Sequence, residues 1–210
     1  RTSELNSRRL ISSNRTHDNS YYRNHKPLLD NFGTTHVSVM DADGLAVSAT
    51  STINQLFGGA VYSKRTGIIL NNELVDFCGR VDSIQGAVYP SHAGEQPPSS
   101  MSPVILEKES GGILVMGGSG GSLITTSMAL SLINRLWLGM SLKDSIAAPI
   151  IFVSSNNDVN FEPEFDKVTR LGHKTGNWPF FLNVVNALEK ENGCIAAVSD
   201  SRKLGMSAGY

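Results

Sequence analysis

The chain has 210 residues, of which 40% are hydrophobic, and this is enough for one globular domain with its own core. The formal net charge is −1, so the composition gives no electrostatic signature of nucleic-acid binding or of attraction to an anionic membrane surface. The charge is unevenly spread, because residues 1–33 carry six Lys and Arg against three Asp and Glu, while residues 34–210 carry twelve against sixteen.

Residues 1–33 are polar and show little periodicity. They predict a short helix ending near Leu10-Ile11, followed by an exposed loop. Asn14 begins a glycosylation sequon, which is weak evidence for secretion. The chain has no initiator Met, no signal peptide and no clean membrane span, so we expect a fragment of a longer protein whose anchor or signal lies in the missing N-terminal part.

Residues 33–54 predict a β-hairpin whose turn is at Asp43-Gly44. Seven hydroxyls lie on it, and most hydroxyls on hairpins face solvent, so we expect that for any one of them: Thr34, Thr35, Ser38, Ser48, Thr50, Ser51 and Thr52. Thr34 is a special case because it follows Gly33. If the bond between them is cut, the new α-amine of Thr34 can act as the base that makes its own hydroxyl a nucleophile.

After the hairpin, the sequence predicts a loop through Ser63–Gly67 and a short buried strand over Ile68–Leu70. Glu73 and Asp76 follow, three residues apart, and would converge on one helical turn or a curled loop. Two converging carboxylates suit a substrate ammonium, although solvated charges on a loop are the more common arrangement.

The stretch from Arg80 to Ser102 predicts a long Gly/Pro/Ser loop, in which prolines stiffen the chain around Ser99 and Ser100. Hydroxyls held in this way could bind a carboxylate.

A strand over 113–116, a glycine loop over 117–121 and a helix over 122–138 come next. Such a unit can bind phosphate at the helix N-terminus, or it can form an oxyanion hole for acyl transfer. The phosphate patterns fail, because there is no Gly-Lys-Ser/Thr and position 123 is Leu.

The remaining elements are a helix over 142–148 capped by Ser141, a helix over 164–171, and a hairpin over 180–198 that turns at Asn192-Gly193. Cys78 and Cys194 could pair, but their spacing does not decide it. The five histidines lack metal-ligand spacing and there is no cysteine cluster, so we expect no metal site.

Six stretches, in this order, resemble the small-subunit region of the γ-glutamyltransferases (glutathione hydrolases). They are Thr34-Thr35-His36-Val37-Ser38-Val39, Ser48–Asn54, Gly67–Glu73, Pro98–Pro103, Gly117–Gly121, and the ending Ser199–Lys203 through Ala208-Gly209-Tyr210. Within this family, Tyr62–Leu74, Ala147–Ile150 and Pro179–Val185 are most similar to the γ-glutamyl leukotrienase branch.

The resemblance implies an α+β fold, the αββα sandwich of the N-terminal-nucleophile hydrolases. It implies a precursor that cuts itself between Gly33 and Thr34, so that residues 1–33 end a large subunit and residues 34–210 form the small subunit of a heterodimer. The implied reaction cleaves the γ-glutamyl amide bond of glutathione and its S-conjugates, including leukotriene C4, through a γ-glutamyl ester on Thr34. No cofactor is implied, and the location would be the cell surface or the extracellular medium.

The resemblance also implies roles for individual residues. Thr34 would be the nucleophile and Thr52 its hydroxyl partner, while Gly120 and Gly121 would supply the oxyanion N–H groups. The α-ammonium of the substrate would be bound by Asn54, Glu73 and Asp76, and its α-carboxylate by Ser99 and Ser100.

The chain departs from the usual family pattern in three places: Val75 stands where a second acidic residue is common, Glu95-Gln96 where a basic residue is common, and Ile150 where Arg is common. These departures leave a non-catalytic paralogue, kept for binding or pairing, as the alternative. We expect residues 1–210 alone to be inactive and poorly folded, because the sheet requires strands of the large subunit.

Overall fold

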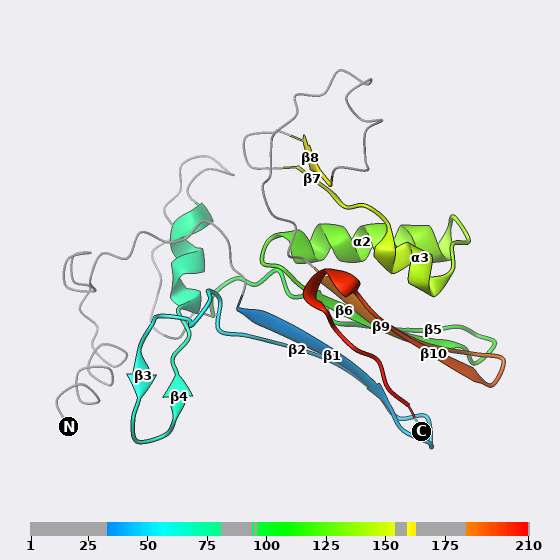
Figure 1. The fold of residues 1–210 in the computed structure, drawn as a ribbon, viewed down its shortest axis with the longest axis horizontal. Coiled ribbons are helices and arrows are strands. Elements are labelled where there is room, and N and C mark those ends of the chain that lie inside the picture. Colours follow the sequence, from blue (N-terminus) through cyan, green and yellow to red (C-terminus); the bar gives the residue numbers. More distant parts are fainter. Residues whose placement is uncertain (1–32, 81–93, 95, 154–158, 163–183, 210) are drawn as a thin grey trace.

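The computed structural model describes residues 33–80, 94, 96–153, 159–162 and 184–209. In this part of the chain the main elements form three layers (Figure 1). Two helices cover one face of a four-stranded antiparallel sheet, and a two-stranded hairpin covers the other. These are three of the four layers of the predicted αββα sandwich.

The central sheet has the strand order β10-β9-β6-β5. Its strands are β5 (Val104–Glu107), β6 (Ile113–Ser119), β9 (Val184–Glu191) and β10 (Cys194–Ser199). Side chains alternate along a strand, so β6 directs Leu114 and Met116 toward the helices and Val115 and Gly117 toward the hairpin. Because both faces of β6 are covered, this strand is buried almost throughout.

The helical layer consists of α2 (Leu123–Leu136) and α3 (Leu142–Ala147). Its apolar side chains and those of the sheet form one core: Leu114, Met116, Ile124, Met128, Leu142, Ile146, Val185 and Ala187. The Ser141 hydroxyl accepts the N–H of Asp144, as expected of an N-cap. Both helices are thus confirmed, with ends within two residues of their predicted positions.

The predicted N-terminal hairpin is confirmed as β1 (Thr34–Met40) paired with β2 (Ala46–Thr52), in the register Thr34 opposite Thr52. Gly44 has a φ of +90°, which favours glycine at this turn. Val37, Val39 and Val47 are exposed on the outer face of the hairpin.

The expectation that the hairpin hydroxyls face solvent is wrong for most of them. Thr35 and Ser51 are exposed, but five lie on the half-buried face that packs against β6: Thr34, Ser38, Ser48, Thr50 and Thr52. The Ser48 hydroxyl donates to the carbonyl of Met116 at 2.9 Å. The sheet beneath the hairpin therefore satisfies the Ser48 hydroxyl, which solvent would otherwise hydrate.

A small β-hairpin leads to the predicted carboxylates. It pairs β3 (Tyr62–Ser63) with β4 (Ile68–Ile69), and the 3₁₀ helix η1 (Glu73–Arg80) follows. The loop predicted for 63–67 is therefore partly strand, and the strand predicted as buried is not, since Ile68 is 55% exposed. Ile68 is exposed because this hairpin projects away from the three layers (Figure 1).

The glycine loop predicted for 117–121 is shorter than expected. Gly117, Gly118 and Ser119 continue β6, because they pair with Asn186, Val185 and Val184 of β9. Of the predicted loop, only Gly120 and Gly121 lie in the turn into α2, which Ser122 completes.

The C-terminal hairpin is confirmed where it is described. β9 and β10 are joined at Asn192-Gly193, and both residues have positive φ. The short strands β7 (Ile151–Val153) and β8 (Val159–Phe161) were not predicted. The 3₁₀ helix η3 (Ser201–Lys203) follows β10.

Several predictions lie outside the described residues: the tail 1–32 with its helix and Asn14, the helix 164–171, and the first part of the hairpin at 180–183. The Cys78 side chain is not described either, while Cys194 is a free, exposed thiol. Among the helices that the structure describes, none is long and apolar enough to cross a membrane.

Candidate active site

Thr34 and Thr52 form a hydroxyl pair at the open end of the β1–β2 hairpin. Their Oγ1 atoms lie 2.8 Å apart. The Thr52 oxygen also accepts the backbone N–H of Asn54 at 2.9 Å. The Thr52 hydroxyl can still donate its own proton, either to Thr34 or to the Gly33 carbonyl 3.5 Å away, and either threonine can be the donor within the pair.

Gly33, which precedes Thr34, is held by backbone hydrogen bonds at both its N–H and its carbonyl. The Gly33 N–H donates to the carbonyl of Asn54 at 2.8 Å, and the Gly33 carbonyl accepts the N–H of Ile53 at 3.0 Å. A Cβ at position 33 would overlap the carbonyl oxygen of Gln55, so glycine is required by the close approach of the two backbones. The Gly33 carbonyl is therefore polarised next to the Thr34 hydroxyl.

Two carboxylates converge near Asn54. Glu73 and Asp76 occupy the first turn of η1, which confirms the predicted helical turn. Asn54 is 2% exposed, has a φ of +69°, and donates from Nδ2 to Asp76 Oδ1 at 3.0 Å and to the carbonyl of Asn72 at 3.2 Å. Burial, and then the negative charge of Asp76, raise the pKa of the Glu73 carboxyl above its ordinary value.

Two acceptor atoms at this place have no donor. Asn54 Oδ1 and Glu73 Oε2 are buried and accept no hydrogen bond from any described residue. A buried acceptor left in this state costs about 1–3 kcal/mol. An ammonium group would supply the missing N–H donors and the missing positive charge.

Asn72 and Gln55, which sequence reasoning missed, fix these carboxylates against the hairpin. The Gln55 N–H donates to Asn72 Oδ1 at 3.3 Å, and Asn72 Nδ2 donates to Gln55 Oε1 at 2.7 Å. Asn71 accepts the N–H of Glu73 at 3.0 Å, as an N-cap does. The Asn-Asn-Glu sequence carried that capping signal, but the contact with Gln55 depends on the tertiary fold.

Gly120 and Gly121 link β6 to α2 with φ values of +133° and +60°. Their carbonyls accept the N–H groups of Leu123 and Ile124. Within the described chain, the N–H groups of the two glycines have no backbone acceptor. An N–H group in this position can donate to a negatively charged oxygen.

Lys203, which sequence reasoning also missed, lies beside this turn. Its Nζ donates to Ser119 Oγ at 2.9 Å, and burial lowers the pKa of the ammonium, an effect that Asp200 opposes.

The segment that carries Lys203 is held by an ion-pair cluster of Glu162, Asp200 and Arg202. Arg202 donates to Glu162 Oε2 at 2.7 Å and to Asp200 Oδ2 at 2.9 Å. The same guanidinium also donates to the carbonyls of Ile146 and Ala148 at the end of α3.

Ser99 and Ser100 lie in an irregular segment near the first turn of α2. The Ser99 hydroxyl accepts the N–H of Met101, and the Ser100 carbonyl accepts the hydroxyls of Ser102 and Thr125. These contacts do not join the two serines to Thr34 or to the carboxylates. Across the described ranges, no group of three or more His, Cys, Asp or Glu side chains could hold a metal ion.

Comparison with known proteins gives a consistent result. The sequence model of one family, described as gamma-glutamyltranspeptidase, matches residues 3–210. The rat protein named glutathione hydrolase 5 proenzyme is 46% identical over 211 residues, which cover 97% of this chain and 37% of the rat protein. The human protein of the same name is 43% identical over 225 residues, covering 97% of this chain and 38% of its own length. The chain thus spans less than two fifths of these relatives.

A solved structure gives the same fold. It is the γ-glutamyltranspeptidase from Pseudomonas nitroreducens in complex with L-DON, with a TM-score of 0.72 and 26% identity. The match covers 84% of this chain and 98% of the solved chain. The predicted fold class is thereby confirmed.

Proposed function

The chain belongs to the γ-glutamyltranspeptidase family, and we propose that it is the part of a longer precursor that carries the catalytic threonine of a glutathione hydrolase. The observation that carries this proposal is the 2.8 Å contact between the Thr34 and Thr52 hydroxyls, directly after a peptide bond whose carbonyl is polarised. The family resemblance predicted from sequence is confirmed. The leukotrienase branch is supported because rat, human and mouse relatives at 43–47% identity share the name glutathione hydrolase 5.

The proposed first reaction is self-cleavage. The Thr34 hydroxyl oxygen attacks the Gly33 carbonyl carbon, its proton passes to the Thr34 amide nitrogen, and the C–N bond breaks to leave an ester. Water hydrolyses that ester, which frees a carboxylate on Gly33 and an α-amine on Thr34. Residues 1–33 then end the large subunit, and residues 34–210 form the small subunit of the heterodimer.

In the mature enzyme the Thr34 amine takes the proton of the Thr34 hydroxyl. The oxygen attacks the γ-carbonyl of the substrate, the leaving amine takes up the proton, and a γ-glutamyl ester remains on Thr34. Water, or an acceptor amine, releases the γ-glutamyl group. Gly120 and Gly121 stabilise the negative oxygen of each tetrahedral intermediate, while Thr52 orients the nucleophile.

The same site selects a γ-glutamyl substrate. Its α-ammonium is bound by Asn54, Glu73 and Asp76. The two buried acceptors without donors support this role, because an ammonium would donate to them. Ser99 and Ser100 bind its α-carboxylate. The proposed substrates are glutathione and its S-conjugates, including leukotriene C4, and the partner is the large subunit of the same precursor. The sequon at Asn14 supports an extracellular or cell-surface location.

The test is to express the full-length precursor and to determine the N-terminus of the smaller fragment by mass spectrometry. A fragment that begins at Thr34, together with release of glutamate from glutathione, supports the proposal, and the Thr34→Ala precursor should stay intact. Assays with leukotriene C4 then decide the branch. An intact, inactive wild-type precursor would favour the non-catalytic paralogue.

A further inference from the structure

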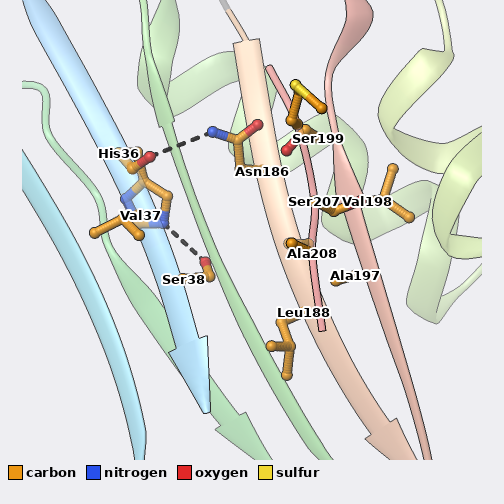
Figure 2. A pocket seen from close by; sticks show the side chains of 12 residues that line it. His36, Val37, Ser38, Asn186, Leu188, Ala197, Val198, Ser199, Ser207 and Ala208 are labelled. Atoms are coloured by element: carbon orange, nitrogen blue, oxygen red, sulfur yellow. Dashed lines mark hydrogen bonds between the residues drawn. The ribbon is translucent and has the colours of Figure 1, made fainter. Parts of the chain in front are cut away.

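His36 is buried between the hairpin and the central sheet, and only 7% of its surface is exposed. Its ring fills the space directly over Gly117 of β6. A Cβ on Gly117 would overlap Cε1 and Nδ1 of the imidazole, so no other residue fits opposite this ring. Figure 2 shows the ring on β1, alongside β6 and β9.

Two hydroxyls hold the ring in this place. Nδ1 lies 2.8 Å from Thr50 Oγ1, and Nε2 lies 3.0 Å from Ser38 Oγ. The backbone carbonyl of His36 accepts Asn186 Nδ2 at 3.4 Å (Figure 2). Burial lowers the pKa of the imidazole, and a neutral ring with one N–H suits two hydroxyls that can each donate or accept. The ring is therefore fixed to β1, β2 and, through contact, β6.

The contact lies between the two halves of the candidate active site. Along β1, His36 comes two residues after Thr34. Along β6, Gly117 comes three residues before Gly120. Ser38 pairs with Ser48, and Ser48 bonds to Met116, so moving back along β1 corresponds to moving forward along β6. Thr34 and the Gly120–Gly121 turn consequently lie at the same end of these strands (Figure 1).

We propose that the packing of His36 on Gly117 sets the distance between the Thr34 hydroxyl and the Gly120–Gly121 turn, which makes His36 a positioning residue for acyl transfer. This role rests on the proposed function. Acyl transfer requires the nucleophile and the oxyanion donors in fixed geometry, and a displacement of about 1 Å can cost about 100-fold in rate. Neither element can shift while the ring occupies a space that only glycine leaves open.

The test compares variants of the full-length precursor. Gly117→Ala adds one methyl group under the ring and should push the β1–β2 hairpin away from the central sheet. His36→Ala removes the ring, and the double variant places the new methyl group in the vacated space. Gly118→Ala is the matched control, because its methyl group would also be crowded, but on the other face of β6, where it would overlap the Val184 carbonyl oxygen instead of the ring. Self-cleavage rate, kcat per cleaved molecule, KM and Tm are measured for each.

We expect Gly117→Ala to lower kcat by about 100-fold with KM within about twofold. The double variant should be no worse than His36→Ala alone, whereas His36→Ala should not rescue Gly118→Ala. Thr50→Val, which removes one hydrogen bond to the ring without adding volume, should lower kcat severalfold and serves if Gly117→Ala does not fold.

Three results would overturn the inference. The first is a Gly117→Ala variant whose Tm falls while its kcat per cleaved molecule is unchanged, because the contact would then be purely structural. The second is a double variant whose loss is the product of the single losses. The third is unchanged kcat in Thr50→Val. A wild-type precursor that is neither cleaved nor active overturns the proposed function, and with it this role of His36.

Discussion

Thr34 and Thr52 are the first cross-strand pair of the β1–β2 hairpin, and their side-chain oxygens are 2.8 Å apart. Both hydroxyls lie on the face that packs against β6. A slip of one residue in the hairpin register would turn Thr34 to the exposed face, where Thr35 now lies. The register of the hairpin therefore determines whether this end of the strand can act as a nucleophile.

Replacing Thr52 with alanine should slow both self-cleavage and turnover. The substitution removes the hydroxyl partner of Thr34 and the acceptor of the Asn54 N–H. Loss of about 1–3 kcal/mol of hydrogen bonding corresponds to about 5- to 150-fold in rate. Thr52→Ser keeps the hydroxyl and should retain most of the activity. The rate of appearance of the fragment beginning at Thr34 measures the effect, and equal rates for the two variants would refute it.

Substrate affinity should weaken as the pH falls, because Glu73 binds a proton more readily than an ordinary glutamate. Burial and Asp76 raise the pKa of Glu73, so this group takes up a proton early on acidification. Protonated Glu73 no longer attracts an ammonium. Conversely, a bound ammonium lowers this pKa, so by linkage binding is tighter at higher pH. The measurement is the pH profile of KM for glutathione.

Glu73→Gln should remove the acidic limb of that profile, because glutamine does not titrate. It should also raise KM at neutral pH, since one negative charge near the ammonium is lost. An unchanged limb in Glu73→Gln would assign the titration to another group.

The elements of this fold that could be predicted are those with a strong local signal. The Asp43-Gly44 turn, the Ser141 cap and the Asn192-Gly193 turn each fixed an element close to its observed place. The spacing of Glu73 and Asp76 allowed them to converge on a helical turn, although it fitted solvated charges on a loop as well.

What could not be predicted depends on contacts between layers. A hairpin with many hydroxyls has the pattern of a solvent-facing strand pair, and only the presence of β6 beneath it turns five of them inward. In the same way, Gly117 has the sequence pattern of a loop, but the pairing with β9 makes it a strand residue under His36. Lys203 and Ser119 are 84 positions apart, so nothing local indicated their contact.

Replacing Asn54 with glycine and with alanine should separate the effect of its backbone conformation from the effect of its side chain. Asn54 has a φ of +69°, which glycine adopts without strain and alanine does not. Both variants lose the amide that bonds to Asp76, so both should raise KM. Asn54→Ala should be the less stable by about 1 kcal/mol, because of the left-handed conformation. Urea unfolding of the mature enzyme measures the difference, and equal stability would contradict this account.

Arg202→Met should destabilise the mature enzyme far more than Lys108→Met, although each removes one cation from an ion pair. The Arg202 and Asp200 side chains are 14% and 1% exposed, whereas Lys108 and Glu191 are 42% and 40% exposed. Losing Arg202 removes the guanidinium that bonds to both the buried Asp200 and the partly buried Glu162, which costs about 3–5 kcal/mol. Losing Lys108 should cost at most about 1 kcal/mol.

The same pair of variants also tests what the ion-pair cluster does for the active site. Because Lys203 follows Arg202 and donates to Ser119 next to the glycine turn, Arg202→Met should lower kcat as well as stability. Lys108 lies in the turn between β5 and β6, at the end of β6 away from the glycine turn, so Lys108→Met should leave kcat unchanged. The comparison uses urea unfolding and kcat per cleaved molecule. If Arg202→Met lost stability but kept its kcat, the cluster would only hold the C-terminal segment in place, without positioning the turn.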